Sequence, residues 1–227
     1  YVVHLVLVAA AALIVAVVPE TRPRRPGRLR PLSPAVPETV RDFFVRAAIL
    51  GFAGFAVMGL FTALAPTIAA QVAGVESVLG QSGLVVTVMG GSLVGQLLGR
   101  RLSERGADAG AVGAMLAGMV LLVAALLTGW WPVLAAAGLT GGAGQGIAFA
   151  RGLAGIATGA PADRKASTTS AYFVVTYVAI SVPVVAEGVL TRAVGVTTAG
   201  IVFAAVVAAL VAVAGALALR AHRRVAA

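Results

Sequence analysis

One carboxylate lies well inside an apolar stretch of the sequence, and such a group can take up and release protons. Glu187 sits near the far end of the run Ser167–Leu190. A carboxylate at membrane depth is costly unless it is solvated, paired or protonated. No apolar stretch contains a lysine partner. We therefore predict that Glu187 tunes proton coupling without being the sole proton carrier. An interfacial Glu beside Arg192 is the alternative.

The same run carries a polar stripe. Tyr172, Thr176, Pro183 and Glu187 fall within ~60° of one another on a helix of 100° per residue. The preceding run carries Gly138, Gly141, Gly142, Gln145, Phe149 and Gly152 on one face. Such faces are typical of helices that line a polar pathway, or of helices that hydrogen-bond and pack closely against their neighbours.

A third group of residues favours ion pairing. Arg151 lies ~20 residues after Trp131, which is enough to cross the bilayer core. It then reaches the boundary, where it can snorkel or pair. We predict that it does not pair with Glu187, which lies toward the opposite bilayer face.

The sequence lacks the residues that other kinds of functional site require. The chain has no cysteine, no phosphate-binding P-loop and no HExxH sequence, and neither paired Asp nor Ser–His combinations are visible. Metal sites and enzymes need clustered ligands, acids or bases. We therefore expect no enzyme, no metal site and no cofactor.

The elements that hold these residues are membrane-spanning helices. Hydrophobic residues make up 60% of the 227 and charged residues 11%, and the mean hydropathy is +1.02. Soluble domains carry about 25% charged residues, more than twice the fraction found here. We therefore expect the chain to have a lipid bilayer as its partner. Helical spans need ~20 apolar residues. The stretches that qualify or nearly qualify are Tyr1–Val18, Phe43–Ala70, Ser82–Leu98, Gly110–Leu127, Trp131–Thr158, Ser167–Leu190 and Thr197–Leu219.

The basic residues that give the net charge of +9 lie mainly in the connections between these stretches. Fifteen of the 17 basic residues fall in alternate connections, including the tail 220–227. The positive-inside rule assigns that side to the cytoplasm, which puts Tyr1 outside and Ala227 inside a cell membrane crossed several times. The basic residues are not gathered on one face, so a nucleic-acid partner is not expected.

This organisation resembles the major facilitator superfamily, whose two six-helix halves are joined by a long cytoplasmic loop. Residues 1–18 would be the last helix of the N-terminal half and 19–42 the Pro- and Arg-rich linker. Residues 43–219 would be the six-helix C-terminal half. The fold class is then all-α integral membrane, with seven transmembrane helices and a missing N-terminal half as partner.

Two stretches carry the resemblance. The sequence GQLLGRRLSERG is similar to the family's motif A, with Gly99 one place early and Glu104–Arg105 as the acidic–Arg pair; its trailing basic cluster is missing. Gln145-Gly146 is similar to the Gln-Gly of motif B, although the motif's Arg falls on Gly142. The resemblance implies a gate at Gly99, Glu104, Arg105 and Arg151, in which Glu104, in the turn after Leu98, pairs with Arg151 or with a neighbouring cytoplasmic basic residue.

By the same resemblance, Gln145, Phe149, Tyr172 and Thr176 would face a central substrate cavity. The expected function is secondary transport of a small molecule by alternating access, as proton-coupled efflux. The alternative is a seven-helix receptor or sensor. A retinal protein is disfavoured, because the only lysine, Lys165, lies in a predicted loop.

Overall fold

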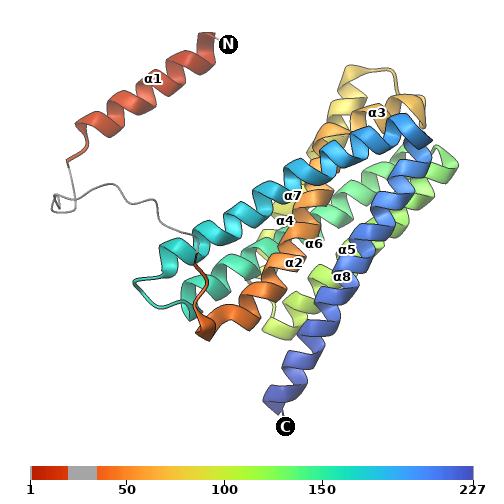
Figure 1. Ribbon diagram of the computed structural model, residues 1–227. Coiled ribbons are helices and arrows are strands. Elements are labelled where there is room, and N and C mark those ends of the chain that lie inside the picture. Colours follow the sequence, from red (N-terminus) through yellow and green to blue (C-terminus); the bar gives the residue numbers. More distant parts are fainter. Residues whose placement is uncertain (1, 20–34, 227) are drawn as a thin grey trace. The chain divides into compact units, whose positions relative to one another are not determined.

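The computed structural model describes residues 2–19 and 35–226, and every regular element in those ranges is an α-helix (Figure 1). The helices are α1 (Val2–Val17), α2 (Glu38–Ala63), α3 (Ala65–Gln71), α4 (Val78–Gly99), α5 (Glu104–Thr128), α6 (Trp131–Gly159), α7 (Lys165–Val194) and α8 (Val196–Ala226). Six of them, α2 and α4 to α8, are long and apolar enough to cross a membrane. This confirms a helical integral membrane protein.

The first predicted span differs from the other six. α1 has 16 residues, which gives a length of about 24 Å and falls short of the ~20 residues that a span needs. Among the described residues, six of the seven predicted spans are therefore helices long enough to cross a membrane, and the seventh is a shorter apolar helix whose spanning role stays a prediction. α1 belongs to a separate unit, Tyr1–Leu32.

Three predicted boundaries also change. The run Phe43–Ala70 is two helices that part at Leu64, because Pro66 cannot continue a helix interior and instead occupies the first turn of α3. α2 starts at Glu38, so the predicted linker 19–42 ends earlier, and most of it lies outside the described residues. α8 runs to Ala226, so residues 220–226 of the predicted tail are helical.

α6 is the central helix of the bundle formed by α2 to α8. It packs most extensively against α4 and α5, and also against α2, whereas α4 and α5 scarcely touch each other. α2 in turn packs on α7, and α8 packs on α5 and α2. The buried polar stripe of α7 therefore faces into the bundle, while Tyr177, predicted on another face, is 65% exposed.

Glycines set the spacing of the α4–α6 contact. A Cβ on Gly91 or Gly95 would collide with the backbone carbonyls of Leu139 and Ala143. On the other side of the seam, a Cβ on Gly142 or Gly146 would meet the carbonyls of α4. Small residues at this four-residue spacing allow helix backbones to approach closely, and this is the packing that the spacing predicts.

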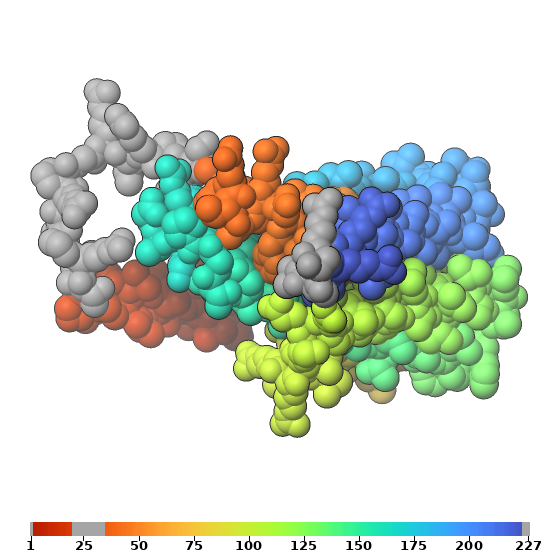
Figure 2. Space-filling model, turned by 90° about the horizontal axis from the view of Figure 1, so that it is seen from below, coloured from red at the N-terminus to blue at the C-terminus, as the bar shows by residue number. Residues whose placement is uncertain are grey.

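Most charged residues gather at one end of the bundle, which we call the basic end. It holds the starts of α2, α5 and α7 and the ends of α4, α6 and α8. In Figure 2 the blue part of α8 lies beside the yellow-green start of α5. The opposite end holds Glu76, Trp130 and Arg192.

We predict that the basic end is cytoplasmic, and thiol labelling tests this. The chain has no cysteine, so a single introduced cysteine is the only reactive thiol. An impermeant maleimide added to intact cells should label Glu76→Cys and spare Lys165→Cys, both at exposed positions. The reverse pattern would contradict the orientation. Arg28, in the predicted cytoplasmic linker, lies outside the described residues.

Candidate functional site: a charged cavity at the basic end

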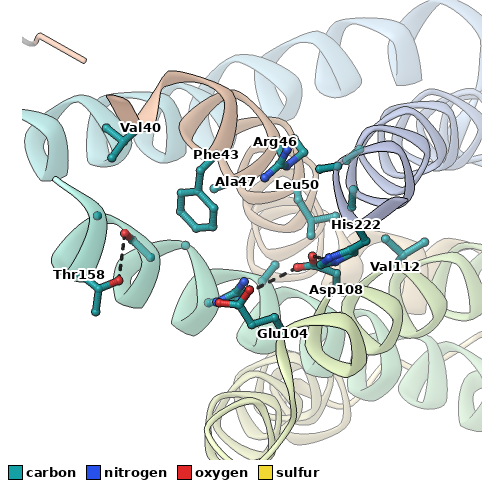
Figure 3. A pocket seen from close by; sticks show the side chains of 18 of the residues that line it. Val40, Phe43, Arg46, Ala47, Leu50, Glu104, Asp108, Val112, Thr158 and His222 are labelled. Carbon is teal, nitrogen blue, oxygen red and sulfur yellow. Dashed lines mark hydrogen bonds and ion pairs between the residues drawn. The ribbon is translucent and has the colours of Figure 1, made fainter. Parts of the chain in front are cut away.

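A cavity of about 350 Å³ opens among α2, α5, α6 and α8 at the basic end (Figure 3). Phe43, Arg46 and Leu50 line it from α2, and Ala221 and His222 line it from α8. The other walls carry the charged residues Glu104 and Asp108 of α5 and Arg151 of α6. The cavity thus combines apolar walls with a small set of charges.

Those charges form one connected network. Arg151 Nη1 lies 2.9 Å from Glu104 Oε1, and Arg151 Nε lies 3.8 Å from Asp108 Oδ1. Asp108 Oδ2 lies 3.0 Å from His222 Nε2. The network therefore ties α6 to α5 and α5 to α8. The predicted contact between Glu104 and Arg151 is present in this structure.

Local sequence explains why both carboxylates meet Arg151. Ser103 caps α5 by accepting a hydrogen bond from the Gly106 amide, so the helix begins at Glu104. A carboxylate in the first turn interacts favourably with the helix dipole. Asp108 follows four residues later and so lies on the same face. The Arg151 guanidinium also lies 5.6 Å from the centre of the Phe43 ring, within cation–π range.

The two remaining residues of the predicted gate lie beside this network. Gly99 packs against Ile147 of α6. Arg105 Nη2 donates a hydrogen bond to the carbonyl oxygen of His222, at 3.4 Å. Arg46 lines the cavity, and no carboxylate pairs with it in the part of the chain that the structure describes.

Sequence reasoning missed Asp108 and His222. The spacing of four residues from Glu104 to Asp108 was available as a signal for a shared helix face. His222 had no such signal, because its contact with Asp108 spans 114 residues of sequence. It also depends on α8 continuing past the predicted end of its span.

The predicted pathway residues lie in the interior of the bundle and are not among the residues that line the cavity. Gln145 is 2% exposed and accepts a hydrogen bond from Ser92 Oγ at 2.6 Å. Thr176 is fully buried and donates its hydroxyl to the Phe173 carbonyl of its own helix. Phe149 is partly buried and stacks on Tyr172, with ring centres 6.2 Å apart. Whether these four residues face a pathway between two halves stays a prediction.

Tyr172 connects this interior to the cavity. Its ring is fully buried, and a Cβ on Gly152, which lines the cavity, would lie 2.6 Å from the hydroxyl oxygen. A Cβ on Gly51 would lie 2.7 Å from the same atom. The two glycines therefore leave space for the hydroxyl group, which has no hydrogen-bond partner among the described residues.

We predict that Tyr172→Phe leaves the fold as stable or more stable, by up to about 1 kcal/mol, because a buried hydroxyl without a partner is unfavourable. Thermal unfolding in detergent measures this. Tyr177→Phe, at an exposed position, is the matched control and should change stability by less than about 0.5 kcal/mol. Destabilisation of Tyr172→Phe by more than about 1 kcal/mol would show instead that the hydroxyl makes a strong hydrogen bond.

Glu187 lies toward the opposite end of α7. It is 5% exposed and makes no ion pair among the described residues, so Arg192 is not its partner in this structure. Arg151, as predicted, pairs elsewhere. The proton-coupling role of Glu187 stays a prediction.

The described residues contain no group of three or more His, Cys, Asp or Glu side chains that could hold a metal ion. Comparison with known protein families, curated proteins and solved structures found no match to this chain.

Proposed function

We propose that the chain is part of a secondary transporter of the major-facilitator type, which moves a small amphipathic solute out of the cell in exchange for protons. In this proposal the basic end is the cytoplasmic gate. The network of Glu104, Asp108, Arg151 and His222 holds the gate closed.

The observation that carries the proposal is the contrast between two kinds of helix contact. α6 meets α4 and α5 through glycines with the backbones in direct contact, and such packing resists change. The basic ends of α5, α6 and α8 meet through side-chain ion pairs around a cavity. Pairs of this kind are individually weak when they are partly exposed. They can separate at low cost, as a two-state gate requires.

Buried polar groups give further support. Carboxylates, hydroxyls and amides are costly to bury inside a membrane protein, and such groups commonly mark solute or ion pathways. Glu187 and Tyr172 of α7 and Gln145 of α6 are all buried in the bundle. Transporters with repeated halves bind their substrates between those halves near the membrane midplane.

The test is flux in proteoliposomes. The full-length protein, reconstituted with an imposed pH gradient, should move ethidium and similar amphipathic fluorescent cations, and a protonophore should abolish the movement. Ala148→Cys, at a buried position lining the cavity, should react with an impermeant maleimide at a rate that depends on the gradient. Absence of both effects would contradict transport and favour a receptor or sensor.

We predict that Glu187→Gln lowers proton-driven transport while leaving substrate exchange largely intact, because exchange needs the substrate pathway but not proton release. Glu76→Gln is the control, since that carboxylate lies in an exposed loop at the same end of the bundle. Both rates are measured in the same vesicles. Unchanged rates and pH dependence in Glu187→Gln would place the coupling carboxylate elsewhere in the protein.

A further inference from the structure

A second hollow, which we call the α5–α8 groove, runs between α5 and α8 at the basic end and encloses about 570 Å³. Its apolar walls include four small residues, together with Val112 and Leu219: Ala109 and Gly113 from α5, Gly215 and Ala218 from α8. A Cβ on Gly113 would have no neighbouring atom within 4 Å. The groove is therefore open space at the surface of two spanning helices.

The groove has the dimensions of the upper part of a lipid chain. Arg105 and Gly113 are eight residues apart on α5, and Gly215 and Arg223 are eight apart on α8. Because the helices are antiparallel, both arginines lie at one end of the groove and both glycines at the other. Eight residues of helix span about 12 Å, which is most of the ~15 Å hydrocarbon depth of one leaflet.

The charges at the mouth of the groove favour an anion. Arg105 and Arg223 are both exposed. One guanidinium nitrogen of Arg105 holds the His222 carbonyl, which leaves its other N–H groups free to donate. The single carboxylate that lines the groove, Asp108, is already engaged by His222 and Arg151. The mouth thus carries excess positive charge above an apolar channel.

We propose that the α5–α8 groove binds an anionic phospholipid of the leaflet at the basic end. An acyl chain lies along the small residues between α5 and α8, and the headgroup phosphate accepts hydrogen bonds from Arg105 and Arg223. Arginine forms strong charge-assisted bonds to phosphate, and basic residues at a membrane surface attract anionic lipid. This inference does not depend on the transport proposed above.

Two other occupants match the groove less well. The apolar segment Val2–Val17 contains no acidic residue, and the sequence that follows it is rich in arginine, so it offers nothing complementary to the mouth. A symmetric contact with a second copy of the chain would bring the same surface together twice and would place the arginines of both copies side by side.

The experiment is lipid titration of the purified full-length protein in detergent, read by native mass spectrometry. Phosphatidylglycerol should bind more tightly than phosphatidylcholine. The double variant Arg105→Gln/Arg223→Gln should weaken phosphatidylglycerol binding roughly 30-fold, at roughly fivefold per arginine, and should leave phosphatidylcholine unaffected. Gly113→Leu fills the groove and should weaken binding of both lipids roughly tenfold, equivalent to about two methylene groups left unburied.

Two variants serve as matched controls. Arg101→Gln removes an exposed charge at the same end, outside the groove, and Gly90→Leu adds a side chain in open space on α4. Neither should change lipid binding. The inference is overturned if the wild type binds the two lipids equally or if the double variant binds like the wild type. It is also overturned if inorganic phosphate displaces the lipid, or if Gly113→Leu dissociates a dimer without changing lipid binding.

Discussion

Replacing Gly95 with alanine is expected to destabilise the bundle by about 3 kcal/mol or more, at the upper end of the cost of overpacking. The added methyl group would collide with the Ala143 carbonyl, a backbone atom that has no rotamer through which to move away. α4 and α6 would have to separate along the seam that contains Ser92 and Gln145, so their buried hydrogen bond would also weaken. For a chain of this size the melting temperature should fall by roughly 6–12 °C.

Gly90, five residues earlier on α4, provides the control for this experiment. A Cβ on Gly90 would have no neighbour within 4 Å, so Gly90→Ala adds the same methyl group to open space. Because alanine is the better helix former, that variant should be unchanged or more stable by up to about 1 kcal/mol. Thermal unfolding of both variants in the same detergent makes the comparison. Equal melting temperatures would show that the α4–α6 seam is not close-packed.

Replacing Arg151 with methionine should open the basic end. The methionine keeps much of the apolar stem but leaves Glu104 without its cation and Asp108 with His222 alone. Removing one partner of a partly buried ion pair costs about 1–2 kcal/mol, below the figure for full burial. In a two-state gate that shifts the closed-to-open ratio roughly tenfold. The maleimide reaction of Ala148→Cys, at the buried cavity wall, should accelerate by a similar factor.

Two carboxylate variants show which contact of Arg151 matters. The Glu104 side chain is 73% exposed, whereas that of Asp108 is 24% exposed and also contacts His222. Glu104→Gln should therefore change the labelling rate by less than about fivefold, as expected for an exposed pair. Asp108→Asn should have the larger effect of the two. If Arg151→Met labels like the parent protein, the network does not hold the basic end closed.

The sequence predicted the parts of this structure that depend on local pattern. Runs of apolar residues located the six spanning helices, because lipid requires ~20 such residues whatever the tertiary fold. Spacing on a helix located the buried stripe of Tyr172, Thr176 and Glu187, and depth in the bilayer separated Arg151 from Glu187. These inferences need only helix geometry and the thickness of a membrane.

The sequence analysis missed three kinds of feature: a break inside one apolar run, the end of a helix, and contacts between distant segments. The break at Leu64 was hidden inside a continuous apolar run, although Pro66 marked it. The end of α8 was placed at Leu219 because arginines follow, yet the helix continues and delivers His222 to Asp108. The second cavity, the α5–α8 groove, arises from small residues on two helices about 100 positions apart and has no local signature.

The central position of α6 sets an order for biogenesis. α4 and α5 are consecutive in the chain but scarcely touch, and each meets its glycine-lined partner only on α6. As the chain leaves the ribosome, α4 and α5 therefore enter the membrane with their close-packing faces open. At about 5–20 residues per second, α6 completes this trio within a few seconds of α5. During that interval a chaperone or the insertion machinery has a specific surface to shield: the α4 face that carries Gly91 and Gly95.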